Sequence, residues 1–121
     1  MKNNSSLEDL QLYQNYVQLM YYTYMICKKF PLEEQGSLVS DLKIVLREGL
    51  DELILAQKSF ERDERLMHLN ALDGKLKVFK VLIRVSQKFR YISSHNYGAW
   101  SRKVAGVTNL LGAWVKKCLK L

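Results

Sequence analysis

The chain has 121 residues, two cysteines, one proline and a formal net charge of +7. A hydrophobic fraction of 48% and a charged fraction of 26% fit a single folded domain, residues 1–121, and exclude a disordered chain. Two cysteines exclude a disulfide framework, so we expect reduced core thiols at Cys27 and Cys118 in a cytoplasmic protein. No apolar run reaches the ~20 residues that span a bilayer.

The first predicted helix covers about residues 6–29 and ends before Phe30-Pro31, since the residue before a proline is pushed out of the helical region. Its apolar positions repeat at intervals of three and four, the period of a coiled-coil seam: Leu10, Tyr13, Val17, Met20, Tyr24 and Cys27. The other tyrosines of this segment, Tyr16, Tyr21 and Tyr22, lie off that seam. We expect them to be half-buried, or to pack at an interface or stack on a base.

The second predicted helix covers about residues 37–59. Its seam has the same spacing: Val39, Leu42, Leu46, Gly49, Leu53, Ala56 and Phe60. A glycine inside a helix costs about 1 kcal/mol relative to alanine. We therefore expect Gly49 to admit a neighbouring backbone or aromatic ring at close range.

The third and fourth predicted helices cover about residues 62–89 and 97–119. The third carries the seam Leu69, Leu72, Leu76, Phe79 and Ile83. The fourth carries the seam Trp100, Val104, Val107, Leu111, Trp114 and Cys118. No segment alternates with a strand period, so the fold class is all-α. Four such helices with short connections predict an antiparallel up-down-up-down four-helix bundle.

The residues that enzymes use are sparse. Glu64 and His68 are four positions apart on one helical face, and we expect them to form a surface pair. A carboxylate-bridged metal bundle needs carboxylates from all four helices, and the fourth predicted helix has none. Phosphate-binding glycine loops, nucleophile motifs and zinc spacings do not occur. The sequence therefore predicts no catalytic residues, no metal and no cofactor.

Charge is unevenly distributed along the chain. Residues 1–73 hold eight basic and twelve acidic residues, a net charge of −4, whereas residues 74–121 hold eleven basic residues and no acid. On the third predicted helix four cations form a stripe at steps of three and four: Lys77, Lys80, Arg84 and Lys88. On the fourth, Arg102, Lys116 and Lys120 share a face.

Like charges four residues apart destabilise a helix by a few tenths of a kcal/mol per pair. Since no acid on the same face relieves the stripe, an external anion is the natural complement. Nucleic-acid phosphates are the commonest such partner, an acidic protein surface is the next, and a merely solvated face is the third interpretation.

Small residues lie between the cations of the fourth predicted helix, on the side opposite its apolar seam. We expect an oligomer contact at Ala105, Gly106, Asn109 and Ala113. Acids of the first half could pair with the basic half of a neighbouring subunit in a ring: Glu48, Asp51, Glu52, Asp63 and Glu64.

The C-terminal half resembles the accessory variability determinant proteins of diversity-generating retroelements. The resembling pieces are Leu82-Ile83-Arg84, Tyr91-Ile92-Ser93 followed by Tyr97, and Gly106 followed by Leu111-Gly112-Ala113-Trp114 and Lys116. The first half matches in outline only, through a helix, the Phe30-Pro31 break and a second helix with Ala56-Gln57-Lys58-Ser59.

The resemblance implies a non-catalytic homopentameric ring that binds nucleic acid and the reverse transcriptase, in support of mutagenic copying of a template RNA into cDNA. It places binding of RNA or DNA, or of the reverse transcriptase, on Lys77, Lys80, Arg84, Lys88, Arg90, Arg102, Lys103, Lys116, Lys117 and Lys120. The alternative function is a protein-only adaptor whose basic face docks an acidic partner. We expect no membrane association, because the seam with Trp100 and Trp114 is needed to close the core.

Overall fold

The structure is a computed structural model that describes the backbone of residues 7–120 and the side chains of residues 9–120. The described part consists of helices and short connections and contains no strand, which confirms the all-α class. Its elements are α1 (Leu7–Cys27), the short 3-10 helix η2 (Leu32–Glu34), α2 (Leu38–Lys58), α3 (Arg62–Lys88) and α4 (Ser94–Leu119). Position 6, the expected first residue of the first helix, lies outside the described residues.

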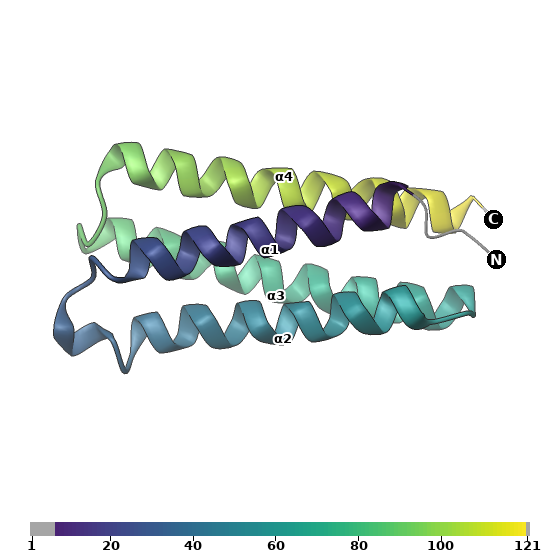
Figure 1. Ribbon diagram of the computed structural model, residues 1–121, viewed down its shortest axis with the longest axis horizontal. Coiled ribbons are helices and arrows are strands. Elements are labelled where there is room, and N and C mark those ends of the chain that lie inside the picture. The colour runs from purple at the N-terminus through teal and green to yellow at the C-terminus, as the bar shows by residue number, and fades with distance from the viewer. Residues whose placement is uncertain (1–6, 121) are drawn as a thin grey trace.

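The four long helices lie side by side as a bundle (Figure 1), with the start of α1 and the end of α4 at one end. The chain turns back at each connection. The α1–α2 and α3–α4 connections lie at one end, and the α2–α3 connection lies at the other (Figure 1). The most extensive contact is between α2 and α3, and the smallest among neighbouring helices is between α1 and α2.

The fourth helix begins at Ser94 rather than near Tyr97, because Ser93 caps it. The Ser93 hydroxyl accepts a hydrogen bond from the backbone N–H of Asn96 at 3.1 Å. A serine at this position satisfies one of the N–H groups that a helix start leaves without a partner. Ser93 is therefore a cap, and residues 94–96 belong to the first helical turn.

The predicted seams of α3 and α4 are buried along their whole length, and so is the seam of α2 except at Phe60. Phe60 follows the end of α2 and is 96% exposed. The helical spacing stops applying where the helix stops, so its place in the seam was wrong. Cys27 and Cys118 are free, buried thiols, as predicted. Burial raises the pKa of Cys27 to about 11, and the nearby Lys43 opposes that rise.

The predicted seam of α1 was wrong, since only Cys27 among its residues is buried. Leu10, Tyr13 and Tyr24 are 40 to 50% exposed. The buried face of α1 contains instead Leu12, Tyr16, Leu19, Thr23 and Ile26. This helix has two apolar faces with the same spacing, and the inner one includes residues with polar ends.

Those polar ends find partners inside the bundle. The Tyr16 hydroxyl donates to the carbonyl of Leu46 at 2.7 Å, and the Trp100 indole N–H donates to the Thr23 hydroxyl at 3.0 Å. Burial raises the pKa of Tyr16, and the nearby Asp51 adds to the rise. A polar group that is buried with a hydrogen-bond partner avoids the free-energy cost of losing its hydrogen bonds to water.

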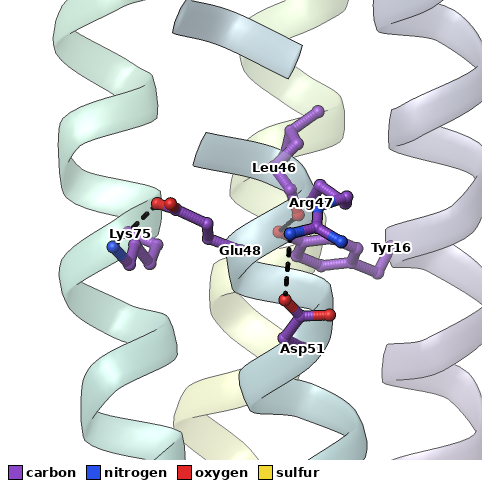
Figure 2. A network of polar contacts seen from close by, with 6 residues as sticks. All are labelled: Tyr16, Leu46, Arg47, Glu48, Asp51 and Lys75. Carbon is purple, nitrogen blue, oxygen red and sulfur yellow. Dashed lines mark hydrogen bonds and ion pairs between the residues drawn. The ribbon is translucent and has the colours of Figure 1, made fainter. Parts of the chain in front are cut away.

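Gly49 makes room for Tyr16, which confirms the prediction of a close ring. Figure 2 shows the Tyr16 ring against α2, with its hydroxyl beside Leu46. A Cβ atom at position 49 would overlap the Tyr16 hydroxyl oxygen and lie 3.2 Å from Cδ1 of Leu72. The glycine thus sets how deeply the α1 tyrosine enters the core.

An aromatic cluster fixes the end of the bundle where α3 turns into α4. Trp100 is fully buried and meets Phe79 and Phe30 edge-on, at ring-centroid distances of 5.8 and 6.4 Å. Phe30 also lies 5.6 Å from the ring of Tyr91, whose hydroxyl donates to Glu34 at 2.8 Å. The α3–α4 turn is therefore held against the α1–α2 connection.

Candidate nucleic-acid interface

Every cation that the sequence assigns to binding has an exposed side chain. On α3 and the following turn these are Lys77, Lys80, Arg84, Lys88 and Arg90. On α4 they are Arg102, Lys103, Lys116, Lys117 and Lys120, the last at the helix C-cap. These cations are therefore accessible to a partner, and their binding role stays a prediction.

The stripe on α3 is not free of acids, contrary to expectation. Lys77 Nζ lies 2.9 Å from Asp73 Oδ2, one helical turn away. The pair is exposed, and such pairs contribute at most about 1 kcal/mol. Within residues 9–120, Lys80, Arg84 and Lys88 make no ion pair, so these three carry the stripe's uncompensated charge.

Most acids expected to reach a neighbouring subunit are already paired inside the chain. The ion pairs are Glu48–Lys75 at 3.0 Å, Asp51–Arg47 at 3.6 Å and Asp63–Arg62 at 3.7 Å, and Glu52 Oε1 lies within hydrogen-bond distance of His68 Nδ1 at 2.8 Å. Figure 2 shows two of them, one bridging α2 to α3 and one within α2. The predicted Glu64–His68 pair was wrong, because His68 faces α2 and meets Glu52.

Arg90 occupies a backbone conformation that arginine seldom adopts, with φ at 62°. It follows the C-cap Phe89, and the chain closes α3 with hydrogen bonds from Arg90 N to the Gln87 carbonyl and from Tyr91 N to the Ser86 carbonyl. This is the Schellman ending, in which glycine is the usual residue at that position. The chain thus places an exposed cation in the turn at a conformational cost.

The start of α4 brings two more cations close to α1. Lys103 Nζ lies 5.2 Å from the centroid of the Tyr22 ring, within the range of a cation–π contact. Burial raises the pKa of Tyr22, and the positive charge of Arg102 works against that rise. Tyr22 therefore packs as a half-buried side chain between α1 and α4.

The small residues of α4 are uncovered by the chain itself. Ala105, Asn109 and Ala113 are exposed and Gly106 is half-buried. A Cβ atom at Gly106 or Gly112 would meet nothing within 4 Å. These residues are not needed to pack the described bundle, as the sequence indicates, and their oligomer role stays a prediction.

Two shallow hollows lie along the basic side of α3. One, of about 240 Å³, lies between α3 and α4 and is lined by Lys80, Ile83, Arg84, Tyr97, Ser101, Val104 and Ala105. The other, of about 380 Å³, lies at the end of α3 and is lined by Val81, Arg84, Val85, Gln87, Lys88 and Phe89.

The sequence-based site did not include Phe89, Tyr97 or Ser101, which line these hollows. Phe89 could have been found, because it lies between Lys88 and Arg90 and falls outside the seam of its helix. Aromatic side chains interleaved with cations are a common pattern in proteins that bind single strands.

Neither a metal centre nor a membrane span emerges from the described residues. No group of three or more His, Cys, Asp or Glu side chains among them could hold a metal ion. None of the helices they form is long and apolar enough to cross a membrane.

Comparison with known protein families gives a match over most of the chain. A family model described as bAvd-like matches residues 10–118, which include most of α1 and nearly all of α4. No curated protein matches the chain.

Proposed function

The chain belongs to the bAvd-like family, and from this membership we propose that it supports mutagenic reverse transcription by binding a reverse transcriptase together with its template RNA or cDNA. The match confirms the resemblance to accessory variability determinants and indicates an accessory protein of the retroelement kind. That family is a non-catalytic one, so we propose a binding role and no enzymatic activity.

The observation that carries this proposal is the uncompensated charge on α3. Lys80, Arg84 and Lys88 are exposed and make no ion pair within residues 9–120. Adjacent members are four residues apart, a spacing at which like charges repel on a helix. A phosphate backbone would neutralise them whatever its base sequence, which suits a protein that handles a template RNA and its copy.

We also propose that the protein acts as a ring of identical subunits, a homopentamer as the family resemblance implies. Two surfaces left uncovered by the chain support a contact between copies. One is the small-residue face of α4, and the other is the outer apolar seam of α1, where Leu10, Tyr13 and Tyr24 are exposed at coiled-coil spacing. Analytical ultracentrifugation would test this, and a monomer at all concentrations would contradict it.

A cytoplasmic location is part of the same proposal. It is supported by two buried thiols that are not joined to each other. Reduced cysteines are usual in reducing compartments, where a retroelement transcript and its polymerase also meet.

The salt dependence of RNA binding tests the proposed function. Neutralising Lys80, Arg84 and Lys88 with glutamine should lower the slope of log K against log salt by about 0.7 for each phosphate of a single strand that the protein no longer neutralises. The matched control neutralises the exposed Lys28, Lys29 and Lys58, which removes the same charge from the other half of the chain. An equal change of slope in both variants would reject the assignment to α3.

The second candidate, a protein-only adaptor, is favoured only by the charge itself. A filter-binding comparison of a generic RNA with an acidic polypeptide separates the two functions. Retention of the polypeptide without retention of the RNA would favour the adaptor.

A further inference from the structure

The end of α3 exposes an aromatic ring among cations. Phe89 is 63% exposed and lines the hollow that also contains Arg84 and Lys88. A large apolar ring in water forgoes the free energy of burial, and the core of this bundle is complete without it. An exposed ring in such a place is suited to a planar partner.

The ring is held in place from behind. Phe89 stacks on Tyr91 with ring centroids 5.8 Å apart and an interplanar angle of 17°. Tyr91 is in turn fixed by its hydrogen bond to Glu34 and its contact with Phe30. Because Phe89 is also the C-cap of α3, its backbone is set by the turn at Arg90. A ring that is ordered beforehand loses little entropy when a ligand stacks on it.

A place for an anion lies next to the ring. Arg84 lines both the Phe89 hollow and the α3–α4 hollow, where Lys80, Tyr97 and Ser101 are its neighbours. In the part of the chain that the structure describes, the hydroxyls of Tyr97 and Ser101 have no hydrogen-bond partner. The α3–α4 hollow therefore offers two cations and two free hydroxyl donors to one phosphate group.

We propose that this end of the α3–α4 face binds single-stranded nucleic acid, with one base stacked on Phe89 and a neighbouring phosphate between Lys80 and Arg84. The inference rests on the proposed function and adds the strandedness of the ligand and the residue that contacts its bases. A duplex of the same charge would meet the cations but not the ring, because its bases are stacked on one another. A single strand can turn a base outward onto an aromatic side chain.

The test replaces Phe89 with leucine, which removes the ring and keeps the side chain apolar. Fluorescence anisotropy would measure the affinity for a single-stranded RNA, a single-stranded DNA of the same sequence, and the corresponding duplex. We expect F89L to lose roughly 5- to 150-fold in affinity for both single strands, the range for one stacked base. Its duplex affinity and salt slope should stay unchanged, because no charge is removed.

Two further variants serve as controls for this test. Phe60→Leu removes another exposed ring, at the α2–α3 connection on the opposite end of the bundle, and should not change any affinity. Phe89→Tyr should retain the affinity that F89L loses, while thermal melting checks that each variant is folded.

The proposal is overturned if F89L binds single strands like the parent protein, or if it loses duplex binding equally. If either result is found and the variant without Lys80, Arg84 and Lys88 still shows a weaker salt dependence of RNA binding, only the stacking inference fails. If the stripe variant also leaves the slope unchanged, the proposed function fails with it.

Discussion

On the side of α3 that faces α2, a lysine and a histidine meet carboxylates of the neighbouring helix. Lys75 pairs with Glu48, and His68 pairs with Glu52. On the side that faces α4 and solvent, Lys80, Arg84 and Lys88 have no such partner within residues 9–120. One helix thus carries a neutralised side and an uncompensated side. The difference indicates that the uncompensated charge of α3 lies on its outer side.

The pairing of acids inside the chain also weakens the expected contact between the acidic half of one copy and the basic half of another. An acidic half facing a basic half of the next copy would need acids that are free to pair. Of the five acids expected in that role, only Glu64 has neither an ion pair nor a side-chain hydrogen bond within residues 9–120. The proposal of a contact between copies therefore rests on the apolar seam of α1 and the small-residue face of α4.

The largest expected effect comes from breaking the packed side of the molecule while leaving the basic side intact. Gly49→Ala would force a methyl group against the Tyr16 hydroxyl and Leu72. Overpacking typically costs about 1–3 kcal/mol, and alanine returns about 1 kcal/mol of helix propensity. We therefore expect the free energy of unfolding to fall by up to about 2 kcal/mol in urea denaturation.

The double variant Tyr16→Phe with Gly49→Ala identifies the cause. Removing the hydroxyl removes the overlap, so the two substitutions should be less destabilising together than the sum of their separate effects. Simple additivity, or a Gly49→Ala variant more stable than the parent, would show that the ring does not control this position. RNA affinity of the folded single variant should be unchanged.

A smaller effect of opposite sign is expected in the turn on the basic side. Arg90→Gly should raise the free energy of unfolding by about 1 kcal/mol, because glycine adopts positive φ without the penalty of a Cβ atom. The same variant loses an exposed cation and should bind RNA more weakly. A variant that is less stable than the parent protein and binds RNA with the same affinity would contradict the view that arginine is kept there for binding.

Local pattern was enough to predict the buried faces of α2, α3 and α4, apart from Phe60. It failed on α1, where two apolar faces share one spacing and the inner face includes Tyr16 and Thr23. The choice between the faces depends on partners distant in the sequence, the Leu46 carbonyl and the Trp100 indole. Periodicity alone carries no information about those partners.

The candidate site could also be predicted only in part. Exposure of the cations followed from their place opposite the seams. The pairs Glu48–Lys75 and Glu52–His68 could not be foreseen, since they depend on the register between α2 and α3. The Asp73–Lys77 pair is different, because its four-residue spacing within one helix is already visible in the sequence.

The measurement that tests the central claim most directly is the salt dependence of stability without any ligand. The claim is that Lys80, Arg84 and Lys88 repel one another and have no counter-charge within residues 9–120. Replacing all three with glutamine should raise the free energy of unfolding at low salt by a few tenths of a kcal/mol per i,i+4 pair. That gain should vanish at high salt through screening, whereas the control Lys75→Gln should lower stability. A triple variant less stable than the parent protein at low salt would contradict the account, because it would mean that these cations are already neutralised from within.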